Sequence, residues 1–190
     1  MKIAVIGAGN GGQAIAGYAA LKGYEVSLFD RNEVKVKELQ GKSSIELRGQ
    51  IKGIGKISCV TTNIGNAVTD ADLVMITTVA NAHAELAKAM APYVQDGQII
   101  ILNPGRTCGA LVFKQALNEV GCSKRYYLGE AQTLVYACRI IENGIVNIIG
   151  IKDDVLLAAL PASDTDHIIE KINQLYPCFI KTDNVLRTGL

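Results

Sequence analysis

The sequence predicts an α/β protein built on a doubly wound, mostly parallel sheet, and three observations support this fold class. Short apolar runs alternate with stretches of helical character up to Gly121, which favours parallel strands joined by right-handed crossovers. Runs such as 99–102 are continuously apolar, as expected of strands covered on both faces. A composition of 49% hydrophobic and 19% charged residues is sufficient for a substantial core and argues against disorder.

The first element is a strand at 2–6 that leads directly into the glycine-rich turn 7–12 and a helix at 12–22. In this pattern Gly7 permits the tight turn, Gly9 lets the backbone approach a pyrophosphate, and Gly12 lets the helix pack against the strand. The start of the helix presents free N–H groups to the phosphates. The sequence therefore predicts a Rossmann-like dinucleotide site.

The second strand, at 25–29, ends at Asp30, where a carboxylate can accept the hydrogen bonds of both ribose hydroxyls. The same carboxylate would repel a 2′-phosphate, which favours NAD. Arg31 has the opposite effect, because an arginine at this point can accept a 2′-phosphate. We therefore expect NAD and leave NADP open.

The middle of the chain continues the alternation of helices and strands. A small hairpin or ribbon at 43–56 interrupts it before the third parallel strand, because glycines separate two short apolar stretches there. The predicted elements around this insertion are helix 32–40, strand 57–61, helix 63–68, strand 73–77, helix 82–91, strand 98–102 and helix 109–120.

After Gly121 the pattern changes to closely spaced strands at 126–130, 137–141 and 145–149. The last two are joined by Glu142-Asn143-Gly144, a hairpin signal. A helix at 163–175 and an edge strand at 178–181 follow. We interpret this part as a smaller, mixed or antiparallel second half of the same Rossmann-like sheet.

The last residues, 184–190, have the pattern of an opening helix that Asp183 or Asn184 could cap. We therefore expect a dinucleotide-binding domain at 1–183 and, at 184–190, the start of a helix leading to a C-terminal domain that is absent from this chain.

Ligands of open α/β sheets bind beyond the carboxyl ends of the strands, where segments 77–83 and 103–106 are expected to join the glycine turn. Apolar residues after the fourth strand would form a wall beside the nicotinamide, and Asn103 would hydrogen-bond its ribose or carboxamide; otherwise these segments are ordinary strand-end turns. The predicted cofactor-binding residues are Gly7, Ala8, Gly9, Asn10, Gly11, Gly12, Asp30, Arg31, Thr78, Val79, Ala80 and Asn103.

Three further side chains are candidates for positioning or for substrate contacts. His83 follows the fourth strand, and its ordinary pKa lies near neutrality; a structural role is the alternative. Arg106 and Arg139 could each hold a substrate carboxylate through paired hydrogen bonds, or could be surface residues. We assign no catalytic residue within the chain.

Charge and cysteine usage exclude several classes of function. The net charge is +1 and no basic run exceeds two residues, so nucleic-acid binding has no electrostatic footprint. No apolar run approaches the length of a membrane span. Five cysteines without a CxxC pair and two scattered histidines give no metal-binding spacing and indicate reduced thiols in the cytoplasm.

Several phrases beyond the glycine turn resemble the opine (octopine/nopaline) dehydrogenase family. They occur in this order: Gly7-Ala8-Gly9-Asn10-Gly11-Gly12, Ala80-Asn81-Ala82-His83, Asn103-Pro104-Gly105-Arg106, Glu130-Ala131-Gln132-Thr133-Leu134-Val135-Tyr136-Ala137-Cys138-Arg139, Ala158-Ala159-Leu160-Pro161 and Asn184-Val185-Leu186. The resemblance covers essentially the whole chain, and the phrases at 130–139 and 158–161 are its most specific parts.

This resemblance implies an N-terminal Rossmann domain followed by a helical domain of the same protein that carries a catalytic histidine–aspartate pair. It also implies small-molecule substrates, an amino acid and a 2-oxo acid, which are condensed and reduced by NAD(P)H. On this reading the chain binds cofactor but does not turn over alone. A face meant for the second domain could make it homodimerise.

Two alternatives remain. One is another two-domain reductase of the ketopantoate or glycerol-3-phosphate type, which would need no amine. The other is a non-catalytic module that senses NAD(H). The sequence does not identify the amino acid or the oxo acid.

Overall fold

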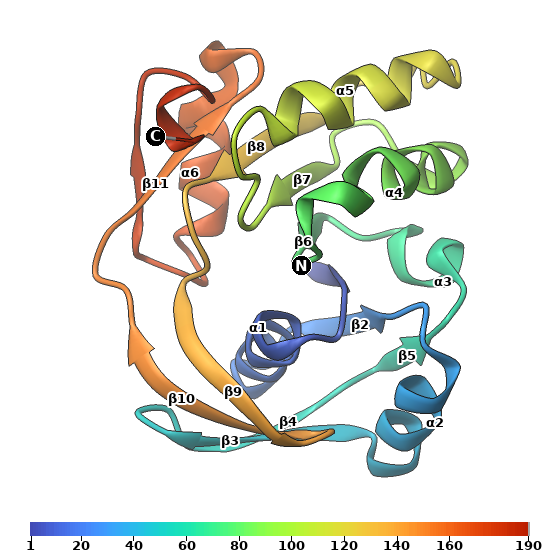
Figure 1. Cartoon of the computed structure of the whole chain (residues 1–190), viewed down its shortest axis with the longest axis vertical. Helices are drawn as coiled ribbons and strands as arrows, with labels where there is room; N and C mark the ends of the chain where they lie inside the picture. Colours follow the sequence, from blue (N-terminus) through green and yellow to red (C-terminus); the bar gives the residue numbers. More distant parts are fainter. Residues whose placement is uncertain (190) are drawn as a thin grey trace.

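The structure, a computed structural model, describes residues 1–189 and contains an eight-stranded sheet (Figure 1). Six strands are parallel and lie in the order third, second, first, fourth, fifth, sixth along the chain, the doubly wound arrangement. From one side of the sheet to the other they are β5 (Cys59–Thr61), β2 (Glu25–Phe29), β1 (Lys2–Ile6), β6 (Leu73–Ile76), β7 (Ile99–Leu102) and β8 (Tyr127–Ala131). The predicted Rossmann-like fold is thus confirmed.

Two strands near the C-terminus extend this sheet. β11 (Val155–Ala159) pairs antiparallel with β8, and β12 (Phe179–Lys181) pairs parallel with β11 at the edge. The edge strand predicted at 178–181 is confirmed, whereas β11 was not anticipated.

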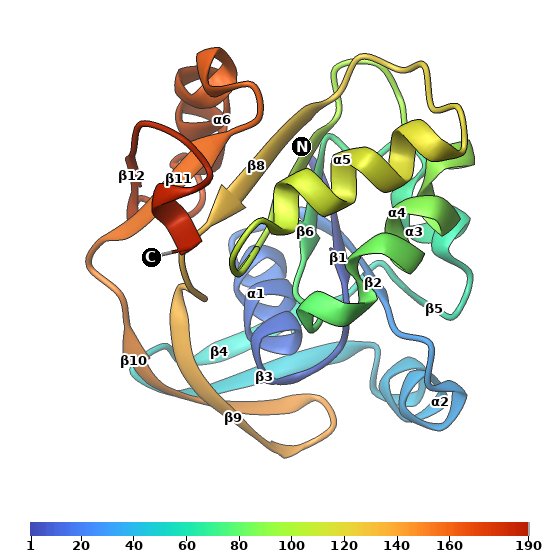
Figure 2. The ribbon, with the colours of Figure 1, turned by 45° about the horizontal axis from the view of Figure 1, so that its top comes forward.

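Helices cover both faces of the sheet, and alternate residues of each strand point to opposite faces. In β1, Ile3 and Val5 pack in the core formed with α1 (Asn10–Leu21) and α6 (Thr165–Ile172). Ala4 and Ile6 face the other core, which is completed by α3 (Ile64–Val68), α4 (His83–Met90) and α5 (Gly109–Glu119). α2 (Glu33–Lys42) lies near β5 (Figure 2).

A second, four-stranded sheet lies over α1, and it corrects the sequence-based topology. Its order is β4 (Gly53–Lys56), β3 (Ser44–Gly49), β10 (Ile145–Ile151), β9 (Tyr136–Glu142). The strands predicted at 137–141 and 145–149 therefore do not extend the Rossmann sheet. They join the predicted hairpin at 43–56, because β10 pairs parallel with β3 and both bury apolar residues against α1 (Figures 1 and 2).

The remaining elements are short 3-10 turns at Ala80–Ala82, Ala91–Tyr93, Ala162–Asp164 and Arg187–Gly189. The helix expected at 163–175 is therefore a 3-10 turn followed by the shorter α6. In the predicted opening helix, Arg187–Gly189 form a 3-10 turn and Leu190 lies outside the described residues. The division into domains at 183 and 184 stays a prediction.

Residues 1–189 lack the features of two other classes of protein. Within them, no helix has the length and apolar character needed to cross a membrane. In the same range, no cluster of three or more histidine, cysteine, aspartate or glutamate side chains is arranged to hold a metal ion. The five cysteines are free thiols.

Candidate functional site

The glycine turn at the start of α1 has the geometry that its sequence requires. Gly7 has a φ of +106°, in the region that favours glycine. A Cβ on Gly12 would lie 1.7 Å from the carbonyl oxygen of Gly7, so a side chain there is excluded. A Cβ on Gly9 would have no atom within 4 Å. The turn is therefore closely packed at Gly12 and open at Gly9, where no side chain caps the helix.

Three side chains hold this turn from different sides. The Thr77 hydroxyl donates to the Gly7 carbonyl (2.8 Å). The buried Gln13 amide donates to the Ala8 carbonyl (3.0 Å), and the Asp30 carboxylate accepts from the Ala8 N–H (2.9 Å). The backbone that would face a pyrophosphate is thus fixed before any ligand binds, which reduces the entropy lost on binding.

The β9–β10 hairpin supports the same turn. Gln13 Oε1 accepts from the Gly144 N–H (2.9 Å), and Gln13 Nε2 lies 3.2 Å from Asn143 Oδ1. Asn10 Oδ1, at the first residue of α1, accepts from the Ile140 N–H (2.8 Å). The second sheet therefore holds the end of α1 that would meet the phosphates.

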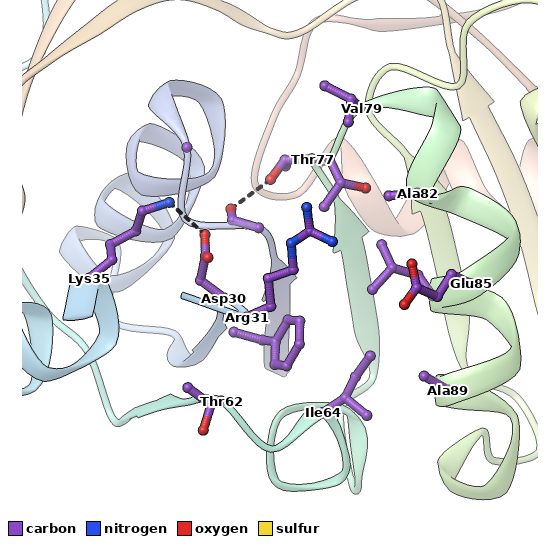
Figure 3. Close-up of a pocket in the computed structure, with 15 residues that line it drawn as sticks. Asp30, Arg31, Lys35, Thr62, Ile64, Thr77, Val79, Ala82, Glu85 and Ala89 are labelled. Carbon is purple, nitrogen blue, oxygen red and sulfur yellow. Dashed lines mark hydrogen bonds and ion pairs between the residues drawn. The ribbon is translucent and has the colours of Figure 1, made fainter. Parts of the chain in front are cut away.

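A cavity of about 470 Å³ opens beside the glycine turn. It lies beyond the carboxyl ends of β1, β2 and β6, where the chain crosses from one side of the sheet to the other; such a switch point is the usual ligand site of this architecture. The predicted residues Gly7, Gly9, Asp30, Arg31, Thr78 and Val79 line it. Figure 3 shows Arg31 in the cavity with Ala82, of the 3-10 turn before α4, and Glu85, on α4.

Asp30 lies at the end of β2 with both carboxylate oxygens engaged. Oδ2 accepts from the Ala8 N–H and from Lys35 Nζ (2.8 Å), and Oδ1 accepts from the Asn32 N–H (3.0 Å). Burial opposes ionisation, but the hydrogen bonds from Lys35, Asn32 and Ala8 outweigh it, so the pKa of Asp30 is lowered. The carboxylate is therefore charged across the physiological range.

Beyond β6 and β7, buried polar atoms lack partners within residues 1–189. They are the Thr78 hydroxyl, both amide atoms of Asn103 and both ring nitrogens of His83. Unpaired buried polar groups are costly and require an explanation, such as water or a ligand. Burial also lowers the pKa of His83, which keeps its ring neutral. Of these residues only Thr78 lines the cavity, whereas Asn103 and His83 lie behind its wall. The Thr78 hydroxyl together with the open glycine turn fits a nicotinamide dinucleotide.

The other predicted site residues do not line the cavity. Ala80 is exposed in the 3-10 turn before α4. Arg106 is exposed in the loop after β7 with a φ of +61°. Arg139 is exposed on β9, opposite Asn147. Ala8, Asn10, Gly11, Gly12, Asn103 and His83 contribute to the surroundings but are not part of the cavity wall.

Thr77 and Ala82, which also line the cavity, belong to the segment 77–83 that the sequence places at this edge. The lining residues that the sequence did not indicate are Phe29, Lys35, Thr62, Ile64, Glu85, Leu86 and Ala89. Some of them had a usable signal, because Thr62 and Ile64 follow the third parallel strand and so belong to the carboxyl edge. Lys35 had none, because a lysine in the first turn of a helix usually faces solvent.

The chain is similar in sequence to known NAD-dependent dehydrogenases. A family model described as the N-terminus of NAD-dependent glycerol-3-phosphate dehydrogenase matches residues 2–108. Opine dehydrogenase from Arthrobacter sp. (strain 1C) is 39% identical over 188 residues, which are 98% of this chain and 52% of that protein. The chain spans about half the length of the relatives it matches.

Solved structures agree on the fold. A structure of octopine dehydrogenase, described as a complex with NADH and pyruvate, matches with a TM-score of 0.87 at 24% identity. The match covers 99% of this chain and 51% of the octopine dehydrogenase chain. A ketopantoate reductase from Ralstonia eutropha has a TM-score of 0.76 at 20% identity, with 98% and 58% covered. The chain thus belongs to the family of NAD-dependent glycerol-3-phosphate dehydrogenase N-terminal domains, and within it is a homologue of the NAD-binding halves of opine dehydrogenases.

Proposed function

We propose that the chain is the cofactor-binding half of an NAD(P)-dependent opine dehydrogenase. Such an enzyme reductively condenses the amine of an amino acid with a 2-oxo acid. The likeness to an opine dehydrogenase along 98% of the chain, at 39% identity, carries this proposal. The cavity at the switch point supports it, because its walls combine a glycine turn with an ionised Asp30.

In this proposal each part of the site has a binding task. The open face at Gly9 and the start of α1 hold the pyrophosphate. Asp30 and Arg31 face the adenosine ribose. Thr78, Val79 and Asn103 surround the nicotinamide, and His83 positions this end through its neutral ring. The bound dinucleotide supplies the hydride, and the chain's residues orient it and exclude water.

The division of labour between domains belongs to the same proposal. Residues 1–183 form the dinucleotide-binding domain, and 184–190 lead toward a second domain that provides the acid–base group and most of the substrate pocket. The lengths of the relatives support this, since each is about twice as long as the matched region. Arg106 and Arg139, exposed on this half, are proposed contacts for substrate carboxylates.

Cofactor binding is tested first on the 190-residue chain by following nicotinamide fluorescence during NADH titration. Gly9→Val places a side chain in open space that the pyrophosphate would occupy. We expect the Kd to rise at least about tenfold, equivalent to about 1.4 kcal/mol, with an unchanged thermal midpoint. Gly41→Ala is the matched control, because its added Cβ also meets no atom within 4 Å, but in α2. Equal NADH affinity in the Gly9 variant would contradict this site.

The reaction is tested by joining the chain to the C-terminal half of the Arthrobacter opine dehydrogenase, the part that the chain does not match. We expect NADH oxidation that requires both a 2-oxo acid and an amino acid. Oxidation with the oxo acid alone would instead favour a reductase of the ketopantoate type. NADH binding without turnover, in a fusion that folds, would favour a sensing module.

A further inference from the structure

The adenosine end of the cavity contains a lysine that the sequence pattern does not mark as a cofactor residue. Lys35 Nζ lies 2.8 Å from Asp30 Oδ2, and the pair is largely shielded, with side-chain exposures of 27% and 12%. Arg31 lines the same cavity. Asp30 therefore has two cationic residues near it, Lys35 and Arg31, and these three side chains carry one positive charge in excess. Glu85, the fourth charged residue that lines the cavity, belongs to α4. Figure 3 shows the Lys35–Asp30 pair beside Arg31.

Local structure fixes the position of Lys35. Asn32 caps α2, and its side chain accepts from the Lys35 N–H (3.0 Å). The side chain of Lys35 then reaches back to the end of β2. Its ammonium group has three donors, and one of them is used by Asp30. Two donors remain for a ligand in the cavity.

The pairing changes what Asp30 does to a ligand. An unopposed carboxylate at this point accepts from the ribose hydroxyls and repels a 2′-phosphate. Here its charge is balanced by Lys35, and Oδ2 already accepts from both Ala8 and Lys35. The repulsion between Asp30 and a 2′-phosphate is therefore weakened. Lys35 and Arg31 together offer two cationic groups that can pair with that phosphate.

We propose that Lys35 is a specificity-determining residue that makes this site accept a 2′-phosphorylated dinucleotide as well as an unphosphorylated one. It acts by neutralising Asp30 and, with Arg31, by pairing with the 2′-phosphate. This inference rests on the proposed cofactor function and adds a specific prediction about the charge of the ribose subsite.

The test is a parallel titration of the 190-residue chain and its variants with NADH and NADPH. We expect wild type to bind both with Kd values within about tenfold of each other. Lys35→Met should weaken NADPH binding by about tenfold or more, the size of a lost charge-assisted hydrogen bond, and should change NADH binding by much less than this. Lys35→Arg keeps the cation and should retain both affinities. Lys37→Met is the matched control, since it removes an exposed cation of the same helix that does not line the cavity.

A selective loss of NADPH binding in Lys35→Met, absent in the other two variants, would support the proposal. Tight NADH binding without NADPH binding in wild type, or an unchanged ratio in Lys35→Met, would overturn it and leave the cofactor function standing. If folded wild type binds neither dinucleotide, both the cofactor function and this inference are wrong.

Discussion

At the residue scale, Glu130 is a fully buried carboxyl group with no cationic partner among its hydrogen bonds. Its Oε2 accepts from the Ala110 N–H (2.7 Å), and its Oε1 lies 3.0 Å from the Thr188 hydroxyl. That hydroxyl has one proton and also lies 2.7 Å from the Val185 carbonyl, which can only accept. The Thr188 hydroxyl can therefore donate fully to only one of these two acceptors, so it stabilises an ionised Glu130 only weakly.

This geometry gives the first prediction. Burial raises the pKa of Glu130 above its ordinary value of 4.5, against the opposing hydrogen bonds. Its contribution to stability is thus fully present below the unfolded pKa and is lost as pH rises through the higher folded pKa. Glu130→Gln mimics the protonated acid and should cost less than Glu130→Ala, because the amide keeps an acceptor for the Ala110 N–H.

Urea unfolding of wild type and Glu130→Gln across pH 4 to about pH 8 checks this. In wild type we expect the free energy of unfolding to decrease as the pH rises, and we expect a smaller decrease in Glu130→Gln. Glu130→Ala, which leaves the Ala110 N–H buried without its acceptor, should cost about 1–3 kcal/mol. A large cost for glutamine together with identical pH slopes would show that Glu130 is ionised.

Individual residues also show how far the sequence alone leads. The positions of Gly7, Gly9 and Asp30 at the cavity follow from the sequence, because each depends on a local backbone or charge requirement in a fixed spacing. Lys35 and Gln13 were not, because a long polar side chain can turn toward the site or toward solvent. The direction that such a side chain takes depends on groups supplied by other elements. For Gln13 these groups belong to the turn at 143–144.

At the scale of elements, the contact between α1 and the β9–β10 hairpin gives the next prediction. Gln13→Ala leaves the Gly144 N–H and the Ala8 carbonyl without their partners. We expect a loss of about 1–3 kcal/mol in unfolding free energy and weaker NADH binding, because the glycine turn is no longer held. Gln115→Ala removes an exposed amide of α5 that bonds Glu119 and serves as the control. Unchanged NADH affinity in a destabilised Gln13 variant would show that the β9–β10 hairpin does not contribute to cofactor binding.

Elements were predictable where their pattern is local. The βα units up to α5 follow from apolar periodicity and capping, including the Asn32 and Asn63 caps. The placement of β9 and β10 in a second sheet was not predictable, because the residue pattern of a strand does not determine which strand it pairs with. β11, at 155–159, was missed because a five-residue apolar run does not by itself distinguish strand from helix.

At the scale of the whole molecule, binding and folding are linked. A ligand that binds the folded chain and not the unfolded one stabilises it by about 1.4 kcal/mol for each tenfold excess over its Kd. We therefore expect the thermal midpoint to rise steadily with NADH concentration. The Gly9→Val chain, measured alongside, should need at least about tenfold more NADH for the same rise. A rise of equal size in both proteins would place the ligand outside the glycine-turn cavity.

The second sheet has a consequence for how the protein is made. Its central pair joins residues 44–49 to 145–151, so it forms only after a long loop closes, a slow step in folding. The glycine turn emerges early in synthesis, yet the Gly144 group that holds it through Gln13 arrives much later. We therefore expect the glycine turn to be held in place only late in synthesis, once residues 44–49 and 145–151 have paired.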